Sequence, residues 1–164
     1  MTDIVLRAIR PDELGLAAEL REKMTRELQR HERGDADRRV NERFVDFYRA
    51  RLAAGTSATF VAESDGALCG LASVYKLVNH RSEIFGQPSA YVSNVYVDPK
   101  RRRQGLATAL TQLCVEWARA HGCVVVRLRT STMGRPVYAA MGFEQSDEME
   151  LQISKTEREP ERQA

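Results

Sequence analysis

Apolar residues along the chain recur at two spacings, every second residue as in strands and roughly every 3.6 residues as in helices. Residues 4–10 alternate as a short strand does, and Pro11 ends it, with Asp12 as the expected N-cap of a helix. Two helix-spaced stretches follow, separated by the polar residues 29–39. Their apolar residues are Leu14, Ala17, Leu20, Met24 and Leu28, then Val40, Phe44, Phe47, Tyr48 and Leu52. The spacing predicts two amphipathic helices after the first strand.

The remainder of the chain returns to strands, with two more helices between them. We expect strands at 59–63, 68–78 and 90–97, a helix from 106 that Gly122 closes, a strand at 124–128, a helix at 135–141 and a strand at 143–153. Asp65-Gly66 marks a hairpin turn, and residues 79–89 are expected to form a polar loop. This order predicts a mixed sheet with helices on its faces, an α/β or α+β architecture.

Composition narrows the class of protein. The 164 residues suggest one domain, expected over residues 1–154, and a charged tail at 155–164 that is expected to fray. With 43% hydrophobic and 29% charged residues and a net charge of +2, the chain is typical of a soluble globular protein rather than a polyanion binder. No apolar run approaches the ~18 residues that a membrane span needs, so no membrane partner is expected.

The three cysteines, Cys69, Cys114 and Cys123, are widely spaced and form no cluster with histidine. Their spacing supports neither a zinc site nor a disulfide framework. We therefore expect reduced thiols packed as small apolar side chains, no bound metal, and a cytoplasmic location.

The candidate chemistry is concentrated in residues 95–110, VYVDPKRRRQGLATAL, where a strand stops at Pro99, four cations follow and a helix begins after Gly105. A helix start has free backbone N–H groups that, with the helix dipole, favour an anion. Gly105 allows a ligand to approach the backbone closely, and Ala107 is nearly as small. Arginine side chains pair well with phosphate oxygens. The stretch therefore predicts a seat for a pyrophosphate.

Two other interpretations of the basic run compete with this one: a solvent-exposed run of charges and a binding patch for nucleic acid. The strand before the run, and the glycine and small residue after it, argue against the first. The chain has no second basic stripe or interleaved aromatic residues, so no nucleic-acid partner is expected. It also has no GxGxxG and no GxxxxGK(S/T), which leaves a dinucleotide-binding fold and a P-loop unsupported.

With these residues the chain resembles the GCN5-related N-acetyltransferase (GNAT) superfamily. The family's acetyl-coenzyme A motif, Q/R-x-x-G-x-G/A between a strand and a helix, is matched by Arg102, Gly105 and Ala107. A second block, GRPVYAAMGF at 134–143, is similar to the family's late helix. The resemblance covers residues 4–153. It implies a mixed, mostly antiparallel sheet of about six to seven strands, with central parallel strands that splay apart, flanked by about four helices.

The resemblance also implies a cofactor, acetyl-CoA, with coenzyme A as the product. Main-chain N–H groups of residues 102–107 would hold its pyrophosphate. Its pantetheine arm would lie between the strands at 90–97 and 123–129, where a bulge in the first strand frees backbone groups. The implied cofactor-binding residues are Val95, Tyr96, Val97, Arg102, Arg103, Gln104, Gly105, Leu106, Ala107 and Thr108.

The implied reaction is attack by a neutral amine on a thioester, which needs a base, oxyanion stabilisation and a proton for the leaving thiolate. Tyr138 matches the family's general acid. Many members carry a carboxylate on the strand before the motif, but residues 91–95 contain none. Ser93 or Asn94 would instead order a water that relays the proton. The alternatives for the base are Glu27, His80 and Glu83.

The acceptor would bind near the first two helices and the loop before the cofactor strand. The residues implied there are Met24, Leu28, His31, Phe44, Tyr48, His80 and Glu83. The predicted function is direct transfer of an acetyl group, in a ternary complex, to a primary amine of a small molecule or a protein. The missing strand carboxylate keeps a non-catalytic acyl-CoA sensor as the alternative. Many relatives dimerise, so a homodimer is also left open, as is the acyl chain length.

Overall fold

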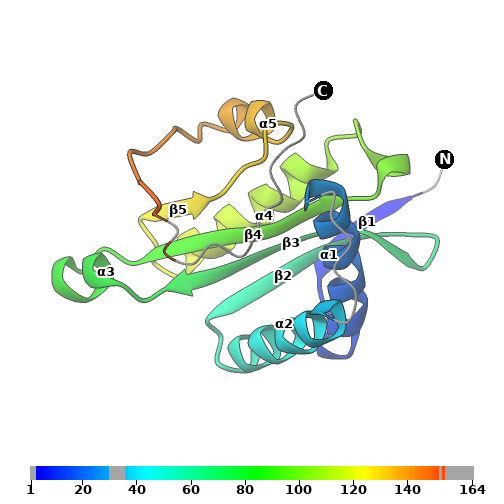
Figure 1. The fold of residues 1–164 in the computed structure, drawn as a ribbon, viewed down its shortest axis with the longest axis horizontal. Coiled ribbons are helices and arrows are strands. Elements are labelled where there is room, and N and C mark those ends of the chain that lie inside the picture. Colours follow the sequence, from blue (N-terminus) through cyan, green and yellow to red (C-terminus); the bar gives the residue numbers. More distant parts are fainter. Residues whose placement is uncertain (1–2, 30–35, 152, 154–164) are drawn as a thin grey trace.

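The computed structural model describes residues 3–29, 36–151 and 153, which form one sheet with helices on both faces (Figure 1). Within this part of the chain the strands lie side by side in sequence order: β1 (Ile4–Ala8), β2 (Ser57–Ser64), β3 (Ala67–Leu77), β4 (Ser89–Val97) and β5 (Val125–Leu128). Neighbours are antiparallel from β1 to β4, and β5 is parallel to β4. The predicted mixed, mostly antiparallel architecture is confirmed.

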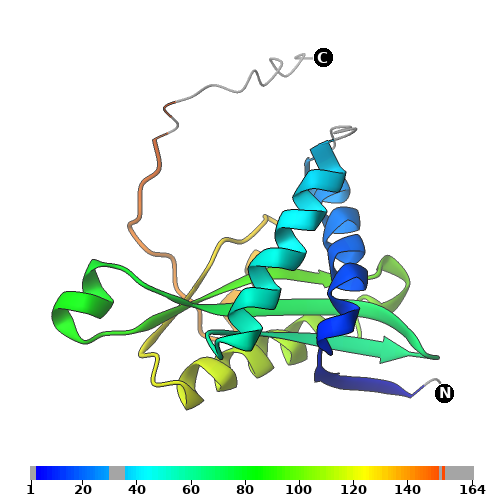
Figure 2. The ribbon, with the colours of Figure 1, turned by 90° about the horizontal axis from the view of Figure 1, so that it is seen from below.

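Long helices cover the two faces of this sheet. α1 (Leu14–Gln29) and α2 (Ala36–Ala53) pack on one face, and α4 (Leu106–Ala120) packs on the other (Figures 1 and 2). The shorter elements are η1 (Pro11–Glu13), α3 (His80–Phe85), η2 (Pro99–Arg101) and α5 (Arg135–Ala140). The predicted N-cap at Asp12 is wrong, because Asp12 lies inside η1, which precedes α1 and begins after Arg10.

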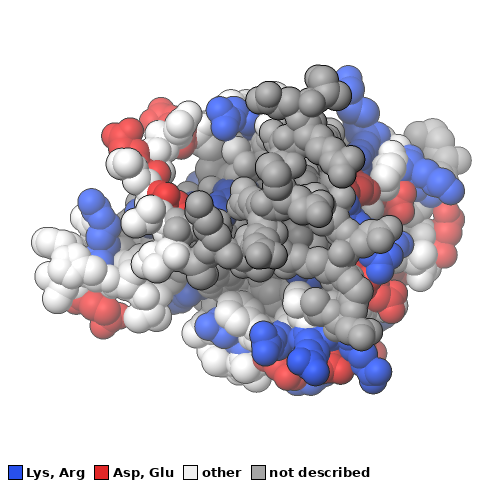
Figure 3. All heavy atoms as spheres, in the orientation of Figure 1, with Lys and Arg blue, Asp and Glu red and all other residues white. Residues whose placement is uncertain are grey.

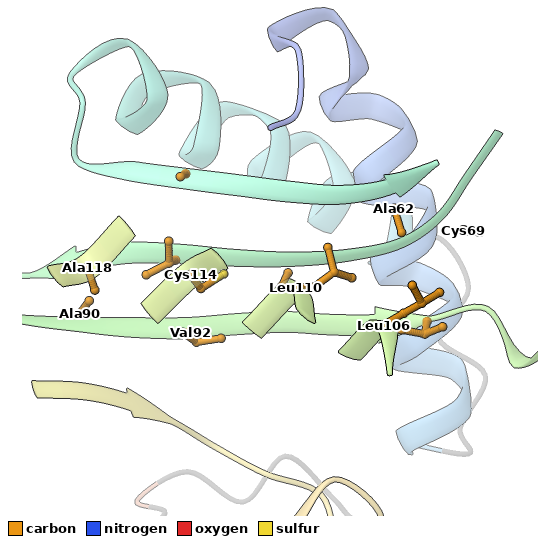
Figure 4. Packing of buried hydrophobic residues seen from close by; sticks show 12 residues of the cluster. Ala62, Cys69, Ala90, Val92, Leu106, Leu110, Cys114 and Ala118 are labelled. Carbon is orange, nitrogen blue, oxygen red and sulfur yellow. The ribbon is translucent and has the colours of Figure 1, made fainter. Parts of the chain in front are cut away.

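A stripe of buried side chains holds α4 against the sheet. Leu106, Leu110, Cys114 and Ala118 follow one another at i, i+4 spacing and face β3 and β4 (Figure 4). Leu110 is fully buried, and burying a leucine contributes about 1.5–3 kcal/mol. This packing fixes the N-terminal end of α4 beside the C-terminal end of β4.

The opposite face carries a second core. Leu14, Ala17 and Leu20 of α1 pack with Phe44 and Tyr48 of α2 against inward side chains of the sheet. These are the helix-spaced positions that the sequence predicts to be apolar faces, so both helices are confirmed. Both remain polar on their outer sides. Lys and Arg alternate with Asp and Glu along the lower edge of Figure 3, where Figure 1 shows α2, and ion pairs there include Arg38 with Glu42.

In the part of the chain that the structure describes, the sheet has five strands, fewer than the about six to seven expected. The expected last strand, 143–153, is wrong for the described part of that segment, where residues 143–151 and 153 belong to no strand. Met149, Leu151 and Ile153 are 95%, 85% and 93% exposed, so their alternation buries nothing against the sheet. Alternation specifies which side chains share a face, but it does not supply a neighbouring strand. The expected charged tail lies outside the described residues, and the domain boundary at 154 stays a prediction.

The expected loop at 79–89 contains the helix α3. Its start is closed by a reciprocal cap: Asn79 Oδ1 accepts from the Ser82 N–H at 3.1 Å, and Ser82 Oγ accepts from the Asn79 N–H at 3.0 Å. Gly86 ends it in a left-handed conformation, with φ of 60°. Asn79, Ser82 and Gly86 are the signal that the sequence interpretation missed. No helix in the described ranges has the length and apolar character needed to cross a membrane.

A network of charges ties η1 to the edge of the sheet. Glu13 is buried and accepts hydrogen bonds from both Nη atoms of Arg7, at 2.8 and 2.7 Å, and from the Arg10 N–H at 2.9 Å. Arg7 also donates to Glu63 of β2 at 2.6 Å. The hydrogen bonds from Arg7 outweigh burial and lower the pKa of Glu13 to about 2.

Replacing Glu13 with Gln should lower the free energy of unfolding by about 2 kcal/mol at neutral pH, because Arg7 loses a charged partner in a buried position. The folded-state pKa lies below the ordinary value of 4.5, so Glu13 stabilises the fold fully above about pH 4.5. This contribution is lost as the pH falls toward 2. Urea unfolding at pH 7 and at pH 3 measures the difference. A deficit in Glu13→Gln that does not shrink at pH 3 would contradict the assignment, and exposed Glu19→Gln is the matched control.

Candidate functional site

A cavity of about 620 Å³ opens where β4, the start of α4, α1 and α5 meet. It brings together most of the residues that the sequence placed in one site. Those lining it are Val95, Tyr96, Val97, Arg102, Arg103, Gly105, Leu106, Ala107, Thr108 and Tyr138, with Met24 and Leu28 of α1. Gln104 is exposed and is not one of its lining residues. In the part of the chain that the structure describes, no three His, Cys, Asp or Glu side chains gather as metal ligands.

The backbone turns sharply where β4 leads into α4. Arg103 and Gly105 both have left-handed conformations, with φ of 63° and 76°. Gly105 is the N-cap of α4, and its carbonyl accepts the first helical hydrogen bond, from the Ala109 N–H at 3.0 Å. The preceding N–H groups at the helix start have no carbonyl in the helix to bond. The residues that carry these N–H groups, Leu106, Ala107 and Thr108, line the cavity at the positively polarised end of α4, which suits an anionic ligand.

Two of the four consecutive cations form hydrogen bonds and ion pairs with other residues of the protein. Arg102 donates from Nε to the Val97 carbonyl at 2.9 Å and from Nη2 to Glu27 at 2.5 Å. Arg101 donates to Ser64 Oγ at 2.9 Å, and its Nη2 lies 3.5 Å from a carboxylate oxygen of Asp65. Lys100 and Arg103 are exposed. The basic run therefore anchors the turn as well as adding charge. The backbone N–H groups at the start of α4 are the better-defined hydrogen-bond donors for an anion.

β4 carries one residue more than β3 between two points of their pairing. Ser93 pairs with Ser73 and Tyr96 with Leu71, so Asn94 and Val95 together stand opposite Ala72. Asn94 has φ of 55°. The bulge implied by the resemblance is therefore present in β4, and such a bulge leaves backbone groups outside the ladder.

The bulge reverses the facing of β4. Before it, Ala90 and Val92 face α4; after it, Val95 and Val97 do, while Tyr96 turns to the α1 and α2 side. On the other edge of β4, pairing with β5 joins Ser89–Val92 to Val125–Leu128 and ends there, although β4 continues to Val97. The two parallel strands separate where the cavity begins.

Tyr138 projects from α5 into the cavity. Burial, with a smaller electrostatic effect of Cys114, raises the pKa of its phenol to about 12. A Cβ at Gly134 would lie 3.1 Å from Cε2 of the Tyr138 ring, so glycine leaves room for the ring to lie close to the backbone. The phenol is protonated at neutral pH and is a hydrogen-bond donor.

Ser93 and Asn94 do not line the cavity; their side chains bond to Tyr48 instead. The Tyr48 hydroxyl lies 2.8 Å from Ser93 Oγ and 2.9 Å from Asn94 Nδ2. Tyr48 and Phe44, both expected near the acceptor, are 3% and 7% exposed and belong to the second core. Burial raises the pKa of Tyr48, outweighing the opposing effect of its hydrogen bond with Ser93.

The other expected acceptor residues are dispersed. His80 and Glu83 belong to α3, which lies at the opposite end of the sheet from α1 in both views (Figures 1 and 2), and neither lines the cavity. His31 lies outside the described residues. Glu27, only an alternative base in the sequence interpretation, is the one carboxylate lining the cavity in the described ranges. Its Oε1 accepts from the Tyr96 hydroxyl at 3.2 Å.

Ser131, Met133, Pro136 and Val137 also line the cavity and were not among the expected site residues. Pro136 and Val137 lie in the 134–143 block, so that block carries the signal for them. Ser131 and Met133 belong to the preceding connection, where the sequence has no pattern that points inward.

Comparison with known proteins agrees with this geometry. The model of the acetyltransferase (GNAT) family matches residues 17–143. The chain is 28% identical over 100 residues to the aminoglycoside N(6')-acetyltransferase type 1 of Serratia marcescens, covering 58% of this chain and 68% of the relative. It is 30% identical over 93 residues to the glucosamine 6-phosphate N-acetyltransferase of Trypanosoma brucei brucei, covering 57% and 62%.

A solved structure extends the similarity to nearly the whole fold. The GCN5-related N-acetyltransferase from Ralstonia eutropha JMP134 superposes with a TM-score of 0.78 at 28% identity, covering 92% of this chain and 99% of that one. The family match spans well over half of the chain and includes the turn at Gly105, the bulged strand and Tyr138. The chain therefore belongs to the acetyltransferase (GNAT) family and is an acetyl-CoA-dependent N-acetyltransferase.

Proposed function

We propose that this enzyme acetylates the primary amine of a small polar molecule, with both substrates meeting in the cavity between β4, α4, α5 and α1. The observation that carries the proposal is that one cavity joins a helix start suited to an anion, a bulged strand edge, a half-buried phenol and a single described carboxylate. Acetyl-CoA supplies the acetyl thioester that the amine attacks, and coenzyme A leaves. The residues present fit this cofactor in three respects.

The first is the binding of the cofactor's anionic part, its pyrophosphate. The left-handed turn at Arg103 and Gly105 exposes the first N–H groups of α4, and the motif's small residue, Ala107, keeps the approach open. These N–H groups would hold the pyrophosphate. The second is the extended arm, which would run along the edge of β4 where β5 has ended and hydrogen-bond the backbone of Val95, Tyr96 and Val97.

The third is the leaving thiolate, to which Tyr138 would donate. Its pKa of about 12 lies well above the about 8.5 of a thiol, so full proton transfer from the phenol is unfavourable. A hydrogen bond from the neutral phenol stabilises the thiolate without that transfer. Tyr138 would thus act as a fixed donor that stays protonated at every pH below about 12.

Glu27 would bind the acceptor's ammonium group and receive its proton. Its side chain is partly exposed within the cavity and is oriented by Arg102 and the Tyr96 hydroxyl. No other carboxylate in the described ranges lines this cavity, whereas Arg101, Arg102 and Arg103 all do. A cationic acceptor would therefore be directed to Glu27 and away from the arginines. Ser93 and Asn94, engaged with Tyr48, are less suited to a proton relay.

The relatives favour an amino sugar as the acceptor. The two curated relatives are named for an aminoglycoside and for glucosamine 6-phosphate. We extend this chemistry to the present chain, as a class of acceptor rather than one compound. The homodimer that the resemblance leaves open is not resolved further, and the expected cytoplasmic location stays a prediction, which the three free cysteines support.

A thiol-release assay with acetyl-CoA and a panel of amines tests the proposed function. The panel contains amino sugars, aminoglycosides, polyamines and lysine peptides. We expect coenzyme A release with at least one amino sugar and none without an amine. Binding of acetyl-CoA with no release for any amine would support the sensor that the sequence left as the alternative.

Tyr138→Phe should lower kcat about ten- to hundredfold, because the thiolate loses its hydrogen-bond donor. The dissociation constant for acetyl-CoA should change less than about twofold, since one hydrogen bond to a neutral sulfur is worth little. Steady-state kinetics and calorimetry measure the two quantities. Unchanged kcat would remove Tyr138 from the reaction.

Glu27→Gln should raise KM for the amine about tenfold, because the acceptor's ammonium loses its counter-charge. Glu19→Gln, an exposed change on the outer side of the same helix, is the matched control and should leave KM unchanged. Since Glu27 also holds Arg102, acetyl-CoA affinity is measured in parallel. An equal loss of acetyl-CoA affinity would show that Glu27 acts on the cofactor turn instead.

A further inference from the structure

The bulge in β4 is held from across the second core by Tyr48 of α2. The Asn94 amide has two N–H donors, and Nδ2 lies 2.9 Å from the Tyr48 oxygen and 3.2 Å from Ser93 Oγ. The Tyr48 hydroxyl lies 2.8 Å from Ser93 Oγ. All three contacts are satisfied together when Asn94 donates to both oxygens and Tyr48 donates to Ser93. The side chains form a closed triangle across the bulge.

Tyr48 itself has little freedom to move. It is 3% exposed, and its ring lies 4.7 Å from that of Phe44 and 5.0 Å from that of Phe47, centroid to centroid. A hydroxyl buried at this depth needs a hydrogen-bond partner. The ring packing therefore presents the Tyr48 oxygen to β4 at a fixed position, and Asn94 and Ser93 are the groups that meet it.

Asn94 is the residue whose backbone makes the bulge unusual. Its φ of 55° is in the left-handed region, which is unfavourable for most residues but tolerated by asparagine. In this conformation the side-chain amide of Asn94 also donates a hydrogen bond to the Tyr48 hydroxyl. A regular strand at this point would put Asn94 opposite Ala72 and reverse the facing of Val95, Tyr96 and Val97.

We propose that Tyr48 is a positioning residue: its hydroxyl holds Asn94 in the left-handed conformation and thereby aims the backbone groups freed by the bulge into the cofactor cavity. Tyr48 touches neither substrate, since it does not line the cavity. The role assigned to it rests on the proposed function only in naming what the backbone groups bind: the acetyl carbonyl at the bulge itself, and the pantetheine arm along Val95, Tyr96 and Val97. Coenzyme A keeps the arm and lacks the acetyl carbonyl, so a loss of affinity confined to acetyl-CoA assigns the effect to the bulge.

The experiment compares the dissociation constants of acetyl-CoA and coenzyme A, by calorimetry, in three variants. Asn94→Ala and Asn94→Gly both remove the amide, but only glycine accepts the left-handed backbone freely. Tyr48→Phe removes the hydroxyl and keeps the ring. Tyr91→Phe, on β4 outside the bulge and paired with Tyr75, is the control for loss of a hydroxyl from this face.

We expect Asn94→Ala to weaken acetyl-CoA binding about tenfold, because the left-handed backbone conformation is unfavourable for alanine. Coenzyme A binding should be nearly unchanged. Asn94→Gly should recover most of that loss, and Tyr48→Phe should fall between the two. Tyr91→Phe should match the wild type. If Asn94→Ala does not fold, the ratio of the two dissociation constants in Tyr48→Phe, compared with that in Tyr91→Phe, still tests the proposal.

One result would overturn the proposal: in Tyr48→Phe, the ratio of the two dissociation constants equals that of the wild type. This holds whether neither affinity changes or both fall equally, as a merely structural role gives. Failure of the proposed function gives a different result. In that case the wild type releases no coenzyme A with any amine, while the comparison of the two ligands still tests the bulge.

Discussion

The extra residue in β4 is the constraint on which the site depends. Between Ser93 and Tyr96 the strand is longer than its partner by one residue, so every side chain after that point changes face. Val95 and Val97 can then pack toward α4 while Tyr96 reaches Glu27 on α1. The same irregularity takes backbone groups out of the ladder just before the strand leads into the turn at Gly105. The proposed seat for the pyrophosphate and the proposed edge for the pantetheine arm are thus consecutive parts of one segment.

The packing of α4 and α1 on opposite faces gives that segment its two neighbours. The stripe from Leu106 to Ala118 holds the start of α4 beside the end of β4, which sets the distance between the anion-binding N–H groups and the strand edge. On the other face, the Glu27 carboxylate holds Arg102, which in turn bonds the Val97 carbonyl. A charge that the sequence suggests as a phosphate ligand is therefore used to brace the turn. In the proposed function, the N–H groups of the helix start would therefore carry most of the affinity for the pyrophosphate.

The parts of the fold that follow from local pattern could be predicted. The stripes of α1, α2 and α4 and the turn at Gly105 depend on spacing and on one residue's freedom, which a sequence displays directly. The bulge was expected from the resemblance, yet a sign of it is present: Ala90 and Val92 are out of phase with Val95 and Val97. Contacts between distant segments could not be predicted. The Tyr48 hydroxyl reaches Asn94 only because α2 crosses the sheet at that point. In the sequence, a tyrosine on the apolar side of a helix has the same spacing whether it faces a substrate or the core. The last strand was wrong for a related reason, since the alternation of Met149, Leu151 and Ile153 cannot supply a strand edge to pair with.

The central claim is that one cavity seats acetyl-CoA by the start of α4 and the bulged edge of β4. A crystal structure of the chain with acetyl-CoA tests it most directly. The account predicts pyrophosphate oxygens about 2.9 Å from N–H groups between Gly105 and Thr108, and the acetyl carbonyl at hydrogen-bond distance from the backbone beside Asn94. Acetyl-CoA bound elsewhere, or a regular β4 in which Asn94 pairs with β3, would contradict it.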